Sequence, residues 1–166
     1  MAKYKYLLAL QAFIFLIPLN VYMWGDWLLV NVQWALVRYQ QSPIGSSIIL
    51  CYKDIFYILE GRTTGIYNIL AASSWTLGSV LLLTGILITL CAWIYERSGL
   101  LRTASLFVIG GGIMYCFSAL GRFTGGFSIP IGVPIIFITG WLLYHQKPGP
   151  EDDEEMSDEE NPEDTE

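Results

Sequence analysis

The stretch SSWTLGSVLLLTGILITLCAWIY, residues 73–95, contains no charged side chain. A bilayer core about 30 Å thick requires about 20 apolar residues of helix, so this stretch is long enough to span it. Inside lipid a chain must satisfy its own backbone hydrogen bonds, which a helix does within one segment. Residues 73–95 therefore predict a transmembrane helix.

Three further stretches share this character, at about residues 6–24, 103–120 and 127–144. Together the four predict an all-α membrane protein, a four-transmembrane-helix bundle within residues 1–147. A mean hydropathy of +0.48 and a charged content of only 14% are typical of this class. Lys3 and Lys5 precede the first stretch, but no small-residue cleavage site follows, so we interpret it as a retained span rather than a cleaved signal.

The net charge of −6 combines two different parts of the chain. Residues 151–166 hold eleven Asp or Glu and no Lys or Arg, so the remaining residues carry a net charge of +5 (−6 plus 11). The composition of residues 148–166 predicts a disordered acidic cytoplasmic tail. The tail either stays solvated without a partner or binds a basic cytoplasmic partner. Its negative charge excludes nucleic acid as a partner.

Basic residues near the span ends predict the orientation in the membrane. If the four spans alternate, five basic residues fall on one side, whereas the short loop opposite holds only Arg122. The five are Lys3, Lys5, Arg97, Arg102 and Lys147. Trp and Tyr also gather at the two expected interfaces. The sequence thus predicts an integral, multi-pass protein of the cell membrane with both termini cytoplasmic.

The outer segment, residues 25–72, is too polar to span and too apolar for an ordinary loop. A helix is expected near 27–41, with Asp26 as its N-cap and Ser42-Pro43 as its end. A second, amphipathic helix is expected near 47–60, before Gly61. A strand over Ser47–Leu59 is the alternative. The two helices either cover the bundle or form a docking surface for another membrane subunit or a lipid.

Small residues predict how the spans pack, because close helix contacts hold membrane bundles together. The second span offers Gly78 and Gly85, and the third offers residues 110–112. The short connections place spans two, three and four as antiparallel neighbours, with a turn expected at 121–126. Pro18 is expected to kink the first span.

No constellation for catalysis, a cofactor or a metal is present in the sequence, so no catalytic, cofactor-binding or metal residue is assigned. Cys51, Cys91 and Cys116 are widely separated, and His145 is the single histidine. The ionisable residues nearest the membrane are expected at its edges: Asp26, Glu96, Arg97 and Arg122. Proton relays and coupled carriers place such groups inside the bundle, which disfavours both.

The sequence favours a non-catalytic structural or accessory subunit that packs against membrane lipids, another integral membrane protein or itself. The alternative is an oligomeric pore or small-molecule facilitator, with Ser79, Thr84 and Thr89 as polar lining. A third hypothesis is a membrane enzyme that uses outer carboxylates or Arg62. The carboxylates are Asp26, Asp54 and Glu60.

Overall fold

The computed structural model describes residues 2–25, 29–123 and 126–146, which form five helices and one five-stranded sheet. The helices are α1 Ala2–Leu16, α2 Cys51–Leu59, α3 Ile66–Ile94, α4 Gly99–Phe123 and α5 Val133–Tyr144. The strands are β1 Asn20–Trp24, β2 Leu29–Gln33, β3 Val37–Ser42, β4 Gly45–Leu50 and β5 Gly126–Ile129. The prediction of an all-α four-transmembrane-helix bundle is therefore wrong.

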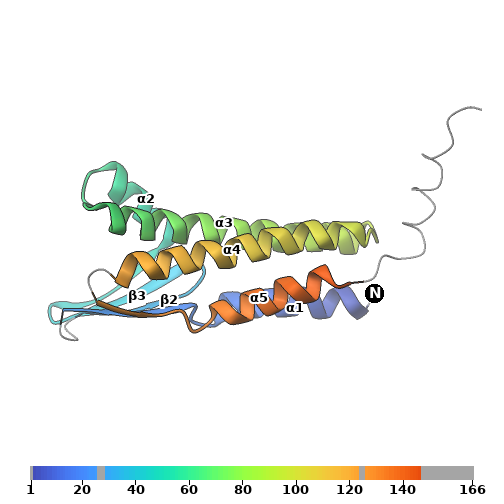
Figure 1. The fold of residues 1–166 in the computed structure, drawn as a ribbon, viewed down its shortest axis with the longest axis horizontal. Helices are drawn as coiled ribbons and strands as arrows, with labels where there is room; N and C mark the ends of the chain where they lie inside the picture. The colour runs from blue at the N-terminus through green and yellow to red at the C-terminus, as the bar shows by residue number, and fades with distance from the viewer. Residues whose placement is uncertain (1, 26–28, 124–125, 147–166) are drawn as a thin grey trace, which may run out of the picture.

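The helices α3 and α4 form a long antiparallel hairpin (Figure 1). With 29 and 25 residues they are about 43 and 37 Å long. Among the described residues these two alone are long and apolar enough to cross a membrane. Only a third of the most apolar window of α3 is buried, with Leu77, Val80 and Leu87 exposed. Such an exposed apolar surface indicates membrane association.

The first and fourth predicted spans each contain a helix and a strand. The helix α1 ends at Leu16, and Pro18 is followed by β1 rather than by a kinked helix. A proline has no N–H to donate and clashes with a preceding helical turn, so it ends the helix here. Similarly β5 precedes α5, which begins with Pro134 in its first turn. Neither helix reaches the length of a span.

The sheet has the strand order β4-β3-β2-β1-β5, and every neighbouring pair is antiparallel. In Figure 1 the sheet lies along one half of the α3–α4 hairpin, and α1 and α5 lie along the other half. The start of α1, the α3–α4 connection and the end of α5 share one end of the molecule, here called the terminal end. The opposite end, which carries the sheet and α2, is called the sheet end.

The outer segment differs from both predicted helices. Residues 29–33 and 37–42 are strands, so the helix near 27–41 is wrong. The helix near 47–60 is wrong in its first part, because β4 continues through Leu50 and α2 occupies only Cys51–Leu59. Gly61 does follow the helix end with φ +70°, a conformation that glycine adopts without strain.

The polarity of the sheet is inverted relative to that of a soluble protein. The register and the contacts of Arg38 place mainly polar side chains on the face toward the helices, and mainly apolar side chains on the face away from them. The exceptions are Trp24, Leu29 and Ile49 on the inward face, and Gln41 and Ser46 on the outward face. The inward face includes Asn20, Tyr22, Asn31, Gln33, Arg38, Gln40, Ser47 and Ser128. The outward face includes Val21, Met23, Val30, Val32, Val37, Tyr39, Ile48, Leu50, Phe127 and Ile129. Polar-in and apolar-out alternation is the pattern of sheets that face lipid.

The turn between β2 and β3 is anchored between α3 and α4. The carbonyl of Ala35 accepts hydrogen bonds from Trp75 Nε1 at 3.1 Å, from Tyr115 Oη at 3.0 Å and from Ser79 Oγ. All four residues are buried. A turn so deep in the molecule needs these donors, because an unpaired buried carbonyl costs free energy.

The glycines of the hairpin lie at close helix contacts. A Cβ on Gly111 would lie 3.0 Å from Leu82 Cδ2, and one on Gly85 would lie 2.8 Å from Val108 Cγ2. Gly121, expected in a turn, instead belongs to α4. A Cβ there would lie 2.7 Å from the backbone oxygen of Tyr67. Small residues therefore set the spacing of α3 and α4 along their length.

Candidate functional site

A buried ion pair joins the sheet to α2. Arg38 on β3 donates from Nη1 to Asp54 Oδ2 at 2.9 Å and from Nη2 to Oδ1 at 3.0 Å. Both residues are buried, at 7% and 4% exposure. The guanidinium also lies 5.3 Å from the ring of Trp75 on α3. A bidentate pair with an aromatic neighbour fixes the positions of three elements relative to one another.

A second arginine reaches the same carboxylate from α4. Arg122 Nη2 lies 3.9 Å from Asp54 Oδ2, beyond hydrogen-bond distance, and the side chain is only 11% exposed. Its guanidinium lies 4.8 Å from the ring of Tyr22 on β1. Its Nε has no hydrogen-bond partner among the described residues, and neither has Nε of Arg38. Two guanidinium groups thus share one carboxylate, which leaves this cluster with a net charge of +1.

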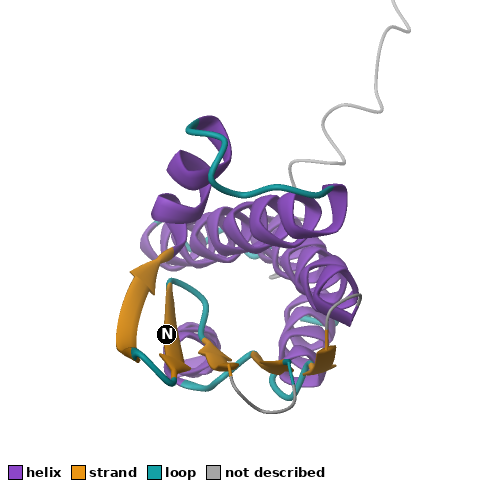
Figure 2. Cartoon of the chain, turned by 90° about the vertical axis from the view of Figure 1, so that its left-hand side faces the viewer, coloured by secondary structure: helices purple, strands orange, loops and turns teal. Residues whose placement is uncertain are grey.

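A cavity of about 240 Å³ lies against this cluster at the sheet end. Figure 2 looks onto that end and shows the strands on one side and the long helices on the other, with further helical turns behind the strands. The cavity is lined by Trp24, Arg38, Asp54, Tyr57, Arg62, Thr63, Thr64, Asn68, Ala72 and Arg122. At the rim Arg62 Nε pairs with Glu60 at 2.7 Å, and both side chains are exposed. The lining is dominated by hydrogen-bond donors.

Further polar side chains continue along the inward face of the sheet. Asn31 and Gln33 are fully buried, and neither amide has a hydrogen-bond partner among the described residues. Asn20 Oδ1 accepts a bond from Ser128 Oγ at 3.0 Å, but its Nδ2 is unpartnered. Buried amides normally find partners, in the protein or in bound solvent and ligand. Bound solvent or a ligand would supply the missing partners, and the interior next to this row of side chains is called the polar chamber below.

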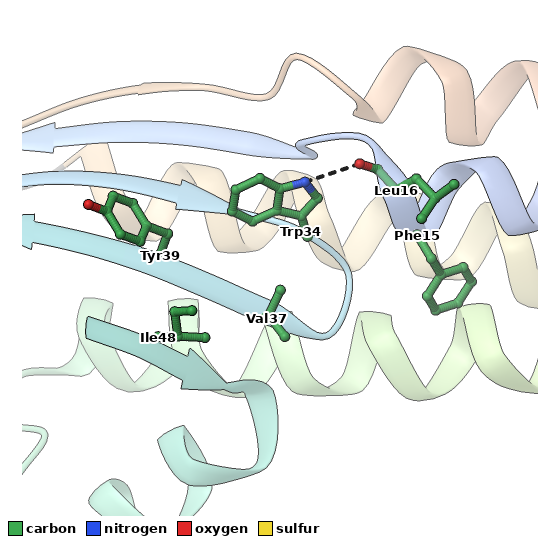
Figure 3. Close-up of a pocket in the computed structure, with 6 residues that line it drawn as sticks. All are labelled: Phe15, Leu16, Trp34, Val37, Tyr39 and Ile48. Carbon is green, nitrogen blue, oxygen red and sulfur yellow. Dashed lines mark hydrogen bonds between the residues drawn. The ribbon is translucent and has the colours of Figure 1, made fainter. Parts of the chain in front are cut away.

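A second cavity, of about 400 Å³, is apolar and lies where α1 gives way to the sheet (Figure 3). Its lining is Phe15, Leu16, Trp34, Val37, Tyr39 and Ile48. Trp34 Nε1 donates to the carbonyl of Leu16 at 3.2 Å, which satisfies one of the last carbonyls of α1. Val37, Tyr39 and Ile48 belong to the outward face of the sheet, so this hollow faces away from the polar chamber.

The residues named in the sequence hypotheses lie in different parts of the structure. Asp54 is in the cluster, Glu60 and Arg62 form its rim, and Asp26 lies outside the described residues. Arg122 was expected at a membrane edge, but its side chain is only 11% exposed and lies beside Asp54. Glu96 does lie at a helix end, with φ +55°, beside Arg97 in the α3–α4 connection.

The three hydroxyls considered as pore lining are each engaged in a hydrogen bond. Ser79 bonds the Ala35 carbonyl, and Thr84 Oγ1 donates to Val80 O at 2.9 Å within its own helix. Thr89 accepts from Gln11 Nε2 at 2.7 Å, which links α3 to α1. Ser79 and Thr89 therefore link α3 to the β2–β3 turn and to α1, whereas Thr84 bonds only within α3.

The sulfur and imidazole groups form no shared site. All three cysteines are free, and His145 is exposed, with Nδ1 3.0 Å from Trp141 O. Within residues 2–25, 29–123 and 126–146, no group of three His, Cys, Asp or Glu is placed to hold a metal ion.

Sequence reasoning singled out Asp54 but missed Arg38 and the pairing of the two side chains. The helix predicted near 27–41 would include Arg38, whereas the alternation Val-Asn-Val-Gln at 30–33 is a period-two signal for a strand. Only a strand brings Gln33 opposite Arg38 and aligns both on one face.

Comparison of the chain with models of known families, with curated proteins and with solved structures gives no match.

Proposed function

We propose that this protein is a non-catalytic membrane protein that holds a small polar solute in the chamber between its sheet and the α3–α4 hairpin. In this proposal α3 and α4 cross the bilayer, and the outward face of the sheet contacts lipid. The observation that carries it is the inverted polarity of the sheet, with unpartnered amides inside and apolar side chains outside.

The cost of the opposite arrangement supports this proposal. In water the sheet would expose Ile48, Leu50, Phe127 and Ile129 while it buried unpaired amides. Apolar surface in water and unpaired polar groups inside both cost free energy. With lipid outside and a hydrated solute inside, both costs fall. The edge strand β5 packs against α4, which limits the unpaired backbone that lipid would meet.

The chamber in this proposal is closed toward the terminal end. Leu82, Val108 and Ile136 are buried there in one apolar cluster, below the anchored β2–β3 turn. A solute therefore enters and leaves by the sheet end, as in a binding protein. The oligomeric pore remains an untested prediction, and its path would have to run between chains.

The accessory-subunit hypothesis remains compatible with a binding chamber. A solute-binding membrane protein can work with a second membrane protein that transports or senses the solute. We propose the orientation that the charges favour, with the terminal end cytoplasmic, because Lys3, Lys5 and Arg102 lie on helices that start or end there.

Cysteine scanning of β2 tests this proposal. In a variant whose three native cysteines are alanine, Asn31→Cys and Val32→Cys place thiols on opposite faces of one strand. In membranes, we expect Asn31→Cys to react with a small water-soluble methanethiosulfonate and Val32→Cys to resist it. Conversely, a brominated phospholipid should quench a fluorophore attached at position 32 but not one at position 31.

The matched pair controls for depth, because the two positions are adjacent and differ only in the face they occupy. If the water-soluble reagent modifies position 32 as fast as position 31, the outward face meets water and the proposal fails. A protected position 31 would equally contradict it, since the chamber would then be dry.

A further inference from the structure

We propose that the cavity at the sheet end is a binding site for an oxyanion group, a phosphate or a carboxylate, with Arg122 as its principal ligand. This inference rests on the proposed function, because Trp24 and Arg38 of the cavity lie on the same face of the sheet as the unpartnered amides of Asn31 and Gln33. It assigns the chamber a chemical class of solute.

The charge balance of the cluster is the first argument. Arg38 occupies both oxygens of Asp54 through its two bonds, so little of that carboxylate remains for Arg122. Arg122 is nine-tenths buried, yet its nearest approach to the carboxylate is 3.9 Å. A buried charge without a close, hydrogen-bonded counterion is costly. An anion in the adjoining cavity would supply that counterion.

The donors around the cavity are the second argument. Trp24 Nε1 and Arg122 Nε are buried and have no partner among the described residues. Both residues line the cavity, together with Thr63 and Thr64. Arginine favours phosphate and carboxylate because its planar fork donates two parallel bonds. At the rim Arg62 adds a second positive charge, although Glu60 neutralises it.

The size of the cavity is the third argument. At about 240 Å³ it lies below the roughly 300–1,000 Å³ of sites for drug-sized molecules. It therefore suits a small anion or the anionic end of a larger molecule. Asp54 does not repel such a group strongly, because Arg38 neutralises it and lies 5.3 Å from the Trp75 ring that holds the pair in place. Arg38 is thus a positioning residue, and Arg122 the ligand.

The same chemistry is presented by free phosphate and by a phospholipid headgroup, and two arms of one experiment distinguish them. The full chain is reconstituted in phosphatidylcholine nanodiscs, and its melting temperature is measured against inorganic phosphate and against acetate. A parallel preparation replaces part of the lipid with phosphatidic acid, without added phosphate. A ligand that binds the native state raises the melting temperature by mass action.

Arg122→Gln and Arg122→Lys are the test variants, and Arg102→Gln is the matched control. Arg102→Gln removes the same charge from the same helix, about 30 Å away from Arg122. We expect Arg122→Gln to weaken binding of the effective anion about tenfold or more, since truncating a buried charged partner is costly. Arg122→Lys should weaken it less, and Arg102→Gln should not change it.

A rise with inorganic phosphate or acetate identifies a soluble oxyanion, and a rise only with phosphatidic acid identifies a headgroup. If none of these anions stabilises the wild-type chain, or if Arg102→Gln abolishes the effect as Arg122→Gln does, the anion site is refuted. Should Arg122→Gln fail to fold, the answer comes from Arg122→Lys and from wild-type titration. Labelling of positions 31 and 32 reports the chamber independently, so a failed anion site leaves the proposed function standing.

Discussion

At the scale of single residues, Asp54 is the point on which three elements converge. It binds Arg38 of β3 directly, lies near Arg122 of α4, and belongs to α2 itself. We predict that Asp54→Asn lowers the free energy of unfolding by about 3–5 kcal/mol, because it leaves two buried guanidinium groups without a counterion. Chemical unfolding in mild detergent, followed by Trp fluorescence, measures this change.

The exposed pair Glu60–Arg62 provides the control. The side chain of Glu60 is 49% exposed and that of Arg62 is 69% exposed. Glu60→Gln should change the free energy of unfolding by no more than about 1 kcal/mol, the usual range for exposed pairs. Equal losses for Asp54→Asn and Glu60→Gln would contradict the central role of the buried cluster.

Cys51 should react slowly with alkylating reagents. Burial raises the pKa of its thiol above the ordinary value, although a hydrogen bond with Ser79 acts in the opposite direction. A raised pKa means less thiolate at a given pH, and the thiolate is the reactive form. The alkylation rate of Cys51 in the folded chain should therefore still be rising with pH where that of the unfolded chain has levelled off.

Site-resolved mass spectrometry after iodoacetamide treatment, over a pH series, measures both curves. The unfolded chain is the internal reference, since it carries the same thiol without burial. Coincident curves for the folded and unfolded chains would show that Cys51 is not shielded.

At the scale of elements, the long helices were predictable and the sheet was not. The stretch 73–95 lies almost wholly within α3, and 103–120 within α4, because an uninterrupted apolar run encodes a buried or lipid-facing helix. The valine and aromatic residues of the strands also fit a helical pattern, so they do not identify strands by themselves. The polar side of the strands points inward, which sequence periodicity alone cannot reveal, since it gives the two faces but not the surroundings of each.

The glycine contacts between α3 and α4 were also predictable, and they make a specific prediction. Gly78→Leu and Gly111→Leu should each destabilise the chain by about 1–3 kcal/mol, the cost of overpacking. A Cβ added at either position would lie only 3.0 Å from a neighbouring side chain. Thermal unfolding and oligomer size in detergent measure the effect.

Gly110 provides the matched control one residue away. Its Cβ would lie 3.6 Å from Leu81, an ordinary contact, so the site has room for a methyl group. Gly110→Ala should leave the free energy of unfolding unchanged or raise it by up to about 1 kcal/mol through better helix propensity. A large loss there would mean that helix packing does not explain the glycines.

At the scale of the whole molecule, the tail lies outside the described residues, and its role remains a prediction from composition. Removal of residues 148–166 should leave thermal stability nearly unchanged, because an acidic, apolar-poor segment adds no core contact. Comparison of the truncated and full chains in one detergent measures this. A loss larger than that of Gly111→Leu would show that the tail contributes to the fold.

The arrangement of the two ends makes the last prediction. The start of α1 and the α3–α4 connection share the terminal end, whereas α2 lies at the sheet end (Figure 1). If α3 and α4 cross the bilayer, Lys5 and Lys53 lie on opposite sides of it. Both residues are exposed, so each accepts a cysteine without loss of packing. In intact cells, with the native cysteines replaced, an impermeant maleimide should label Lys53→Cys at once and Lys5→Cys only after permeabilisation. The reverse order would invert the orientation that the basic residues favour, and labelling of both from one side would mean that the long hairpin does not span the membrane.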